Sequence, residues 1–526
     1  MNTKVKSAIC DALRVKIVEV EAAMTRGFAG MQLIGNASPV CNDGRERVKS
    51  ALETAGVRLP NQKLVVSLAP GDEKKEGSHW DLAIAVSVAL ACVQDKAPVV
   101  AWDQWLFAAE LGLHGDLKAV RNVVPLAISV LGHRLRGIVI AEKNLAEINA
   151  LLACEYDSLR GLKVIAFETL RQVLDWIYHD RWPPRPHLRG ATFGEPAANV
   201  KQFDDMILTP HQELAALCCA AGGHNVLTVG PPGTGKSMFA ERLVSIIPRM
   251  EKDLHLEALQ IHSAFTHNVS KLLLAGVPPF RSPHHSSSSV ALIGGGQEPG
   301  EVSLAHGGVL FLDEFTEFRR DFLESLRVPL ETGEVAVSRL KNKAKWRCKV
   351  ILIAACNPCP CGWSGSSRRM CNCPTQRVLA YQSKISGPVM DRIDIKLAFN
   401  EVTELVSNFF ETLKTSKGNK TATMLQKVMA ARDLAQKRNA KFSVNFNRDI
   451  PVAHLQESSG LSEAAFSDLI KQFDKESISQ RAMVRSLRVA RTLADLENRT
   501  AVSDEDLSTA IGWQRRVFGS ELWPGK

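Results

Sequence analysis

The sequence lacks an apolar run long enough to cross a lipid bilayer. The longest such run, Leu82 to Val93, is well short of the roughly 20 residues that a membrane-spanning helix needs. The first residues, Met1-Asn-Thr-Lys-Val-Lys, contain no hydrophobic region typical of a signal peptide. We therefore expect a cytoplasmic protein with no membrane partner.

The sequence also lacks a basic tail, internal repeats and a disulfide framework, and each of these absences argues against one class of protein. The net charge is +9, but no basic tail concentrates it, so charge alone does not indicate nucleic-acid binding. No internal repeat of about 20 to 50 residues is visible, which argues against a repeat architecture. Twelve cysteines in a cytoplasmic chain do not indicate a disulfide framework. The length of 526 residues predicts about three globular domains.

A phosphate-binding motif lies near the middle of the chain. Residues 230–237 match the pattern G-x-x-x-x-G-K-[ST], with an apolar strand predicted before them over 225–229 and a helix after them over 238–247. In this motif backbone N–H groups surround a triphosphate, Lys236 reaches its β- and γ-phosphates, and Ser237 ligates Mg²⁺. We therefore predict that ATP and Mg²⁺ bind at Gly230, Pro231, Pro232, Gly233, Thr234, Gly235, Lys236 and Ser237.

Two acidic residues follow the apolar run 309–312. In phosphate-loop enzymes the first acid, here Asp313, helps to hold Mg²⁺, and the second, here Glu314, polarises the attacking water. The alternative is that they form a helix cap or a salt bridge at the end of a strand. Because the pair lies downstream of a phosphate loop, we favour the catalytic interpretation.

A polar residue ends the next apolar run, 351–355. Asn357 precedes Pro358, and an Asn at the tip of a strand beside the γ-phosphate can orient the attacking water. The alternative is an ordinary Asn-Pro turn.

Two arginines are further candidates for contacts to ATP. Arg392 is predicted to reach the γ-phosphate of a neighbouring subunit and stabilise charge in the transition state, which would make activity depend on a ring. Its alternative is an internal ion pair with Asp391 or Asp394. Arg481, on a predicted helix, is a candidate for contact with the nucleotide of its own chain, and its alternative is a solvated basic helix face.

The order of these motifs resembles one known family. The resemblance extends over nearly the whole chain and is carried by the stretches 75–78, 81–85, 220–225, 282–285, 291–296, 299–306, 357–362, 386–388, 391–394 and 488–495. On these residues the chain is similar to the magnesium-chelatase-like ComM/YifB family of AAA+ ATPases. The resemblance implies a homohexamer that uses ATP to move along single-stranded or branched DNA, including branch migration during recombination or natural transformation. It also implies that Asn357 is sensor 1 and that Arg481 is sensor 2.

The sequence predicts an α/β protein in three parts. By resemblance, residues 1–180 form a ribosomal S5/Lon-protease-like α+β domain, and the proline-rich residues 181–205 form a linker. Alternating strands and helices predict an AAA+ phosphate-loop core over 206–400, a parallel sheet with helices on both faces. An all-helical lid is expected over 401–526.

A run of alternating basic residues lies between Glu314 and Asn357. Where this segment is extended, a period of two places its basic side chains on one face. In relatives the segment is a hairpin that points into the pore of the ring, so we predict DNA contacts there. A solvated edge strand is the alternative, and a turn near Asn342 would split the basic face. The predicted DNA-binding residues are Arg339, Lys341, Lys343, Lys345, Arg347 and Lys349.

A second polar segment and a cysteine cluster complete the candidate sites. The loop 278–296 contains His284 and His285 and is interpreted equally as a phosphate contact or as a surface loop; no third ligand at metal spacing accompanies the histidines. A C-x-C…C-x-C pattern is a candidate Zn²⁺ site, although its spacing is tighter than the usual C-x₂₋₄-C and free thiols are the alternative. Its residues are Cys359, Cys361, Cys371 and Cys373.

Three functions are consistent with these motifs. The favoured one is a DNA-translocating ATPase, and the second is a protein-remodelling ATPase similar to the magnesium chelatase motor. The third is a Lon-like ATP-dependent peptidase, which would need a Ser–Lys dyad. Because the nucleophile position of that fold falls on His79, with Ser78 adjacent, the peptidase is the least favoured.

Overall fold

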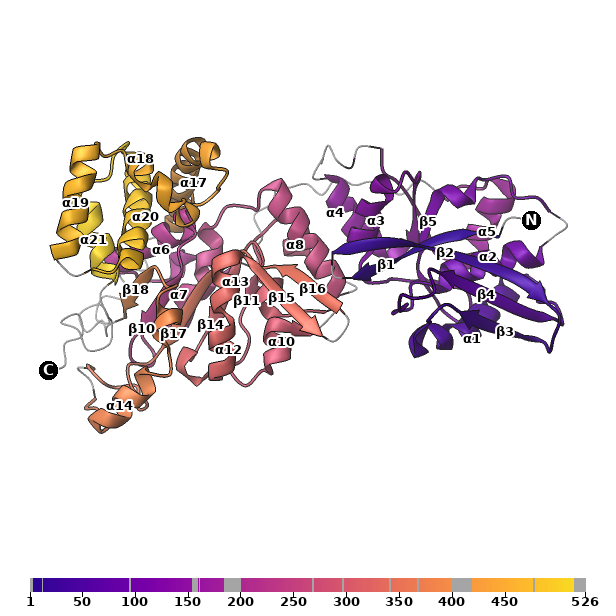
Figure 1. The fold of residues 1–526 in the computed structure, drawn as a ribbon, viewed down its shortest axis with the longest axis horizontal. Helices are drawn as coiled ribbons and strands as arrows, with labels where there is room; N and C mark the ends of the chain where they lie inside the picture. Colours follow the sequence, from indigo (N-terminus) through magenta and orange to yellow (C-terminus); the bar gives the residue numbers. More distant parts are fainter. Residues whose placement is uncertain are drawn as a thin grey trace.

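The computed structural model describes residues 3–11, 13–93, 96–153, 159, 161–183, 200–266, 269–295, 298–339, 342–366, 369–399, 419–475 and 478–514. Figure 1 shows an elongated molecule in which an N-terminal region, a central region and a helical C-terminal region follow one another. Within those ranges, no helix combines the length and apolar character that crossing a membrane requires.

The N-terminal region is built on a seven-stranded sheet in the order β3-β4-β2-β1-β5-β8-β9. Its strands are β1 (Val5–Asp11), β2 (Arg14–Thr25), β3 (Gly30–Ile34), β4 (Lys63–Ala69), β5 (Trp105–Ala108), β8 (Gly137–Ala141) and β9 (Lys163–Phe167), with a small hairpin of β6 (Glu110–Leu111) and β7 (Leu117–Lys118). Strand β2 is antiparallel to both β1 and β4, whereas β1, β5, β8 and β9 pair in parallel. Strand β3 also pairs in parallel with β4, so the sheet is mixed and β2 is the strand that runs antiparallel to both of its neighbours.

Five helices accompany this sheet. They are α1 (Pro39–Thr54), α2 (Asp81–Cys92), α3 (Val123–Gly132), α4 (Leu145–Ala153) and α5 (Leu170–His179). Helix α2 is buried from Asp81 to Ala91, so the longest apolar run of the sequence lies inside this region. The apolar runs 64–69, 138–141 and 164–166 lie in β4, β8 and β9.

The central region contains a five-stranded parallel sheet in the order β11-β14-β17-β10-β18. Its strands are β10 (Val226–Val229), β11 (Phe280–Arg281), β14 (Val309–Leu312), β17 (Ile351–Cys356) and β18 (Ile395–Ala398). The main helices around it are α6 (Pro210–Gly222), α7 (Lys236–Leu243), α8 (Lys252–Phe265), α9 (Lys271–Leu274), α12 (Arg320–Ser325), α13 (Arg327–Thr332), α14 (Thr375–Gln382) and α15 (Gly387–Met390). The predicted parallel-sheet core is confirmed.

Both faces of this sheet are covered. Along β14, Val309 and Phe311 pack with α6, α7 and the C-terminal helices, whereas Leu310 and Leu312 pack with α8 and α12. Strands buried on both faces form continuous apolar runs, which is why the sequence predicts β10, β14 and β17. It does not predict the two-residue β11 or β18, whose residues are alternately buried.

Smaller elements project from the central region. Strands β15 (Glu334–Arg339) and β16 (Asn342–Arg347) form an antiparallel hairpin. Helices α10 (Ser289–Ile293) and α11 (Glu301–Leu304) flank the strand pair β12 (Gly294–Gly295) and β13 (Glu298–Pro299). The loop 278–296, expected to be a polar loop, therefore contains short regular elements in its described part.

The C-terminal region is helical in its described part. Its helices are α17 (Lys420–Asn439), α18 (Leu455–Ser459), α19 (Glu463–Lys475), α20 (Gln480–Leu496) and α21 (Asp504–Gln514). Helices α17 and α20 both pack on α6, so the C-terminal region shares a hydrophobic core with the sheet. The end of the predicted linker also belongs to this core, because Phe203 is buried against Phe239. Residues 184–199 and 401–418 lie outside the described residues.

A second shared core joins the N-terminal and central regions. Val124 and Ala127 of α3 and Leu151 of α4 pack in one buried cluster with Leu259 of α8 and Leu273 of α9. Polar contacts surround this cluster: Ser263 Oγ donates to the Glu147 carboxylate at 3.1 Å, and Arg121 pairs with Glu298 at 2.7 Å. The two regions therefore meet through a packed interface, visible where α8 approaches α3 and α4 in Figure 1.

Candidate nucleotide-binding site

Three neighbouring strands bring the predicted nucleotide residues to one edge of the central sheet. Strand β17 lies between β10 and β14, and all three run parallel. Val229 pairs with Cys356, and Leu312 pairs with Ala354, so the three chains leave the sheet at nearly the same level. The carboxyl ends of parallel strands are where open α/β sheets bind ligands.

The phosphate loop needs glycine at several of its positions. Gly233 and Gly235 have φ of +77° and +89°, a region that side chains disfavour. At Gly230 an added Cβ would lie 2.2 Å from the Phe399 carbonyl oxygen. Helix α7 begins directly after the loop, at Lys236, so its N-terminus faces the position where phosphates bind in this motif.

Lys236 lies folded over its own loop. Its Nζ donates to the carbonyls of Gly230 at 2.7 Å and Pro231 at 2.8 Å, and to Asn357 Oδ1 at 3.3 Å. Burial lowers the pKa of this ammonium. Phosphate oxygens form stronger, charge-assisted bonds than carbonyls, so the buried cation is suited to an anionic ligand.

Ser237 and Asp313 form the predicted Mg²⁺-binding pair. Ser237 Oγ donates to Asp313 Oδ2 at 2.8 Å, and the backbone N–H of Glu314 donates to Asp313 Oδ1 at 2.9 Å. A hydroxyl and a carboxylate oxygen are the ligands that Mg²⁺ prefers. The residues present therefore fit the metal that the motif implies.

Glu314 has an unusual backbone and a partner that the sequence did not reveal. Its φ is +50°, the left-handed region, and strained positions of this kind concentrate at functional sites. His285 Nδ1 lies 2.9 Å from the Glu314 carboxylate. The neighbouring His284 contacts Ser286 instead. No signal in the sequence pairs His285 with Glu314, because the contact joins distant segments.

Arg392 is engaged within its own chain. Its guanidinium donates to the carbonyls of Arg327 at 2.9 Å and Pro388 at 2.7 Å, and to the Glu331 carboxylate at 2.5 Å. The internal partner is therefore Glu331 rather than Asp391 or Asp394, the two acids that the sequence suggested.

Arg481 is largely exposed and lies 3.3 Å from Asp391, which also contacts the buried Arg485. The structure thus gathers Lys236, Asn357 and Asp313 with their neighbours Ser237 and Glu314. Arg392 and Arg481 instead contact other residues of the chain, Glu331 and Asp391.

The basic run is interrupted by a hairpin turn. Arg339 pairs with Asn342 across the ladder, so β16 begins after the first members of the run, and the alternative of a turn near Asn342 is correct. Lys341 and the side chains of Arg339 and Lys343 lie outside the described residues.

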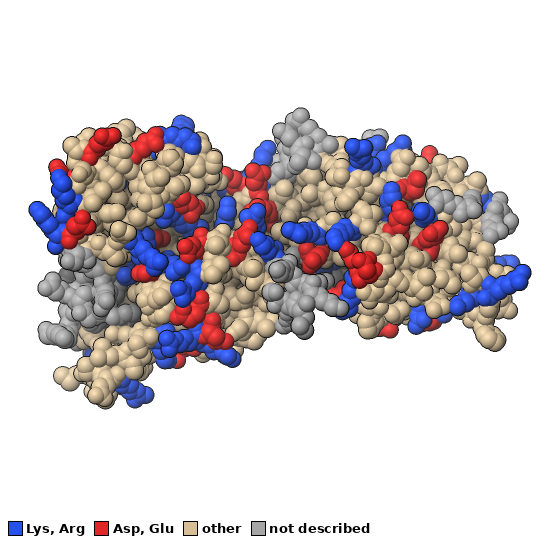
Figure 2. Space-filling model, in the orientation of Figure 1, with Lys and Arg blue, Asp and Glu red and all other residues tan. Residues whose placement is uncertain are grey.

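The described end of the run has acidic partners. Glu334 lies 2.9 Å from Arg347 and 3.7 Å from Lys345, and Trp346, on the alternate position, is fully buried. Lys349 follows the strand rather than belonging to it. Figure 2 shows basic and acidic side chains interspersed on the visible face of the molecule.

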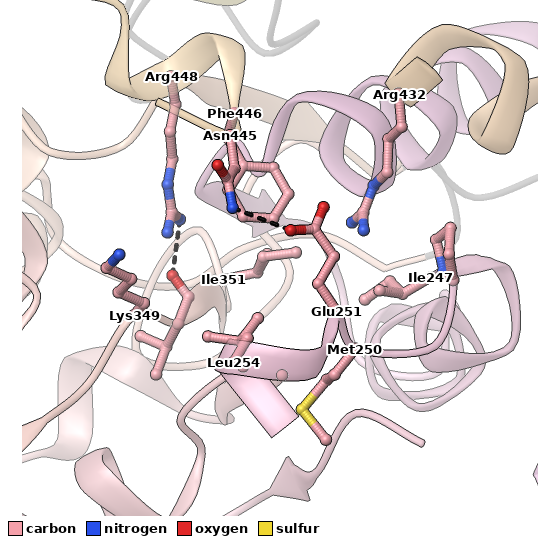
Figure 3. Close-up of a pocket in the computed structure, with 14 residues that line it drawn as sticks. Ile247, Met250, Glu251, Leu254, Lys349, Ile351, Arg432, Asn445, Phe446 and Arg448 are labelled. Atoms are coloured by element: carbon pink, nitrogen blue, oxygen red, sulfur yellow. Dashed lines mark hydrogen bonds between the residues drawn. The ribbon is translucent and has the colours of Figure 1, made fainter. Parts of the chain in front are cut away.

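A small hollow lies at the opposite edge of the central sheet, where β17 begins. Figure 3 shows Lys349 at its rim, with Arg432 and Arg448 above it and Glu251 between them. Arg448 donates to the Val350 carbonyl at 2.6 Å, and Asn445 donates to Glu251 at 3.1 Å. Because the phosphate loop leaves the other edge, this hollow is distinct from the predicted ATP site.

Ser78 and His79, which were considered for a peptidase, have other partners, and so does the nearby Lys75. Lys75 Nζ donates to the carbonyls of Pro70 and Glu73, and Ser78 Oγ donates to the Glu110 carboxylate. His79 Nε2 lies 2.9 Å from the Ala8 carbonyl oxygen, and burial lowers its pKa to about 4. No Ser–Lys contact is formed among these described residues.

Comparison with known proteins gives matches along nearly the whole chain. Three family descriptions match: "Subunit ChlI of Mg-chelatase" over residues 20–144, "Magnesium chelatase, subunit ChlI" over 202–406, and "Magnesium chelatase, subunit ChlI C-terminal" over 418–514. Competence protein ComM of Haemophilus influenzae is 33% identical over 512 residues, which cover 96% of each chain. YifB of Escherichia coli is 32% identical over 501 residues, or 94% of each chain, and YifB of Salmonella typhimurium is 32% identical over 504 residues, again 94% of each. The chain belongs to the magnesium-chelatase-like family that includes ComM and YifB.

Proposed function

We propose that this chain is an AAA+ ATPase that works as a homohexameric ring and moves along single-stranded or branched DNA. Lys236 binds the phosphates, Ser237 and Asp313 hold Mg²⁺, and Glu314 polarises the attacking water while Asn357 orients it. Bound Mg²⁺ supplies charge neutralisation at the phosphates. Arg392 of a neighbouring subunit and Arg481 of the same subunit complete the site in this proposal.

The observation that carries the ATPase proposal is the meeting of three segments at one sheet edge. Lys236 contacts Asn357, and Ser237 contacts Asp313, although these residues come from three separate parts of the chain. Phosphoryl transfer needs little covalent chemistry from a protein and depends on positioned charges and oxygen ligands. These four side chains provide both.

Two observations support movement along DNA. One relative is named a competence protein, and the hairpin β15–β16 carries basic residues that suit contacts to a phosphate backbone. Branch migration in recombination or natural transformation is the activity we expect from this combination.

The second candidate is remodelling of a protein partner, as expected of a magnesium chelatase motor. The three family matches favour it, because each is described by that enzyme's subunit. A peptidase has less support, because Ser78 and Lys75 have separate partners.

The deciding experiment measures ATP hydrolysis with and without a forked or four-way DNA junction. Glu314→Gln should retain ATP binding and lose turnover by roughly two orders of magnitude or more, because the carboxylate that polarises water is absent. DNA should stimulate the parent chain. If DNA does not change the rate of ATP hydrolysis and no DNA binds at low salt, the DNA motor is excluded and the protein-remodelling ATPase remains.

A further inference from the structure

Four cysteine side chains converge in the segment that follows β17. The Sγ atoms of Cys359, Cys361, Cys371 and Cys373 all lie within 4.8 Å of one another, and the three pairs among the first three are 3.4 to 3.6 Å apart. A disulfide would require about 2.05 Å. Thiolates bound to one Zn²⁺ at about 2.3 Å lie roughly 3.8 Å from each other. The four sulfurs therefore have the arrangement of a tetrahedral site.

The surrounding backbone supports charged sulfur atoms. The N–H of Ser364 donates to Cys359 Sγ at 3.3 Å, and the N–H of Cys373 donates to Cys371 Sγ at 3.5 Å. Such outer hydrogen bonds offset the charge of metal-bound thiolates and fix their orientation. The described residues between Asn357 and Pro374 contain neither helix nor strand, so no backbone ladder accounts for their arrangement.

The cysteine segment touches the phosphate loop. Gly362 has φ of +83°, and an added Cβ there would lie 2.9 Å from the ring of Pro232 and 3.8 Å from Asn357 Cγ. On the other side, Gln382 of α14 donates to the Pro358 carbonyl at 3.0 Å. The four sulfurs thus sit in a segment packed between the phosphate loop and α14.

We propose that Cys359, Cys361, Cys371 and Cys373 bind one Zn²⁺, and that this centre holds the segment bearing Asn357 against the phosphate loop. The zinc site is inferred from the geometry of the sulfur atoms and does not depend on the proposed function. Its effect on nucleotide turnover rests on the ATPase function proposed above. Loss of zinc frees the Gly362–Pro232 contact and lets Asn357 drift from Lys236, which slows turnover.

The metal is tested first, on the purified full-length chain. Elemental analysis should find one zinc per chain, and replacement with Co²⁺ should give the charge-transfer and visible bands of tetrahedral thiolate coordination. The double variant Cys371→Ser with Cys373→Ser should lose the metal, whereas Cys92→Ser, a half-buried cysteine at the end of α2, should keep it. A chain that contains no metal, and takes up none from Zn²⁺ alone after reduction, overturns the proposal.

The coupling is tested separately, by a variant that leaves the sulfurs in place. Gly362→Ala should keep one zinc per chain but lower ATP turnover by on the order of tenfold, because its methyl group displaces Pro232. Gly132→Ala is the control, since a Cβ there meets nothing within 4 Å. Unchanged turnover in Gly362→Ala refutes the coupling.

Nucleotide affinity provides a readout that does not depend on hydrolysis. Removing zinc with a chelator that spares magnesium should weaken binding of a fluorescent ATP analogue, and added Zn²⁺ should restore it. If affinity depends on zinc but no hydrolysis occurs under any condition, the zinc centre is coupled to nucleotide binding and the proposed ATPase fails. If the affinity for the ATP analogue does not depend on zinc, the coupling is refuted. The metal analysis then decides on the zinc site independently.

Discussion

The orientation of the Glu314 side chain is fixed by its backbone conformation and by a neighbouring residue. Its left-handed backbone and the 2.9 Å contact to His285 come from different segments, and together they hold the carboxylate in one direction. A general base must lie within hydrogen-bond reach of the proton that it withdraws. We infer that His285 is a positioning residue for Glu314.

Replacing His285 should therefore slow hydrolysis without weakening ATP binding. We expect His285→Ala to lower kcat by roughly ten- to a hundredfold, the size of effect produced by misplacing a catalytic group. His285→Asn, which retains a donor, should recover part of the loss. His133→Ala, an exposed histidine directly after α3, is the control. A fall in ATP affinity with unchanged kcat would contradict the positioning role.

At this scale the sequence predicted the residues that a short motif specifies. Lys236 and Ser237 follow from the spacing of one loop, and Asp313 and Asn357 follow from the ends of apolar runs. The partners His285 and Glu331 could not be predicted, because each reaches its contact only after distant segments have folded together. A lone histidine or glutamate carries no local sign of such a partner.

The hairpin β15–β16 is the element in which we predict the contacts to DNA. Its turn falls within the basic run, and Glu334 offsets part of the charge of Arg347 and Lys345 at the described end. Any basic surface for DNA must therefore depend on residues nearer the turn, in addition to these two.

Charge reversal in the hairpin should separate DNA binding from assembly. We expect Lys341→Glu, Lys343→Glu and Lys345→Glu together to abolish DNA binding and leave the ring intact, as measured by fluorescence anisotropy and by size. Replacing only Lys345 should reduce the slope of log affinity against log salt by about 0.7 for single-stranded DNA. Reversal of Lys437, Lys471 and Lys475, exposed on α17 and α19, changes the net charge equally. If both triple variants bind DNA alike, the hairpin is not the contact.

Among elements, the central strands were predictable and several N-terminal ones were not. Strands β10, β14 and β17 are covered on both faces, so each is a short continuous apolar run. Strand β2 alternates exposed and buried residues, a weaker signal, and the sequence analysis did not identify β1, β2 or β3. The hairpin turn was left open by the sequence, because alternation continues on both sides of it, and the structure confirms the alternative of a turn near Asn342.

Assembly is the first property that belongs to the whole molecule. In this chain Arg392 is bound to Glu331 and to two carbonyls, and a ring would require it to reach a neighbour's ATP. We expect Arg392→Ala to abolish turnover while retaining ATP binding. Glu331→Gln, which removes the charge of the internal ion-pair partner and keeps Arg392, should retain turnover. Full activity of Arg392→Ala, measured on the assembled protein, would refute the role across subunits.

The interface between the N-terminal and central regions should respond to pH through Glu147. Burial raises the pKa of this carboxyl from 4.5 to about 8, and Ser263 is its hydrogen-bond donor. The folded protein therefore binds a proton that the unfolded chain has lost between these values. Stability should fall as pH rises from about 4.5 to 8, and the loss is complete above that range.

Glu147→Gln, which retains the neutral shape, tests this expectation. Its melting temperature should match that of the parent at pH 5 and exceed it at pH 9, as measured by differential scanning calorimetry. Glu53→Gln, an exposed position on α1, should change neither. An equal shift at both pH values would show that the ionisation of Glu147 is not the cause.

The hydrophobic cluster shared by α3, α4, α8 and α9 has a mechanical consequence. Close-packed interiors transmit displacement rather than absorb it, so we expect a tilt of α8 to be passed on to the N-terminal sheet, with which it shares one buried cluster. That sheet extends far from the central region, with β3 near the distal end of the molecule (Figure 1). A slight tilt of α8 would therefore displace β3 further than it displaces α3 and α4, because β3 lies at the greater distance from α8.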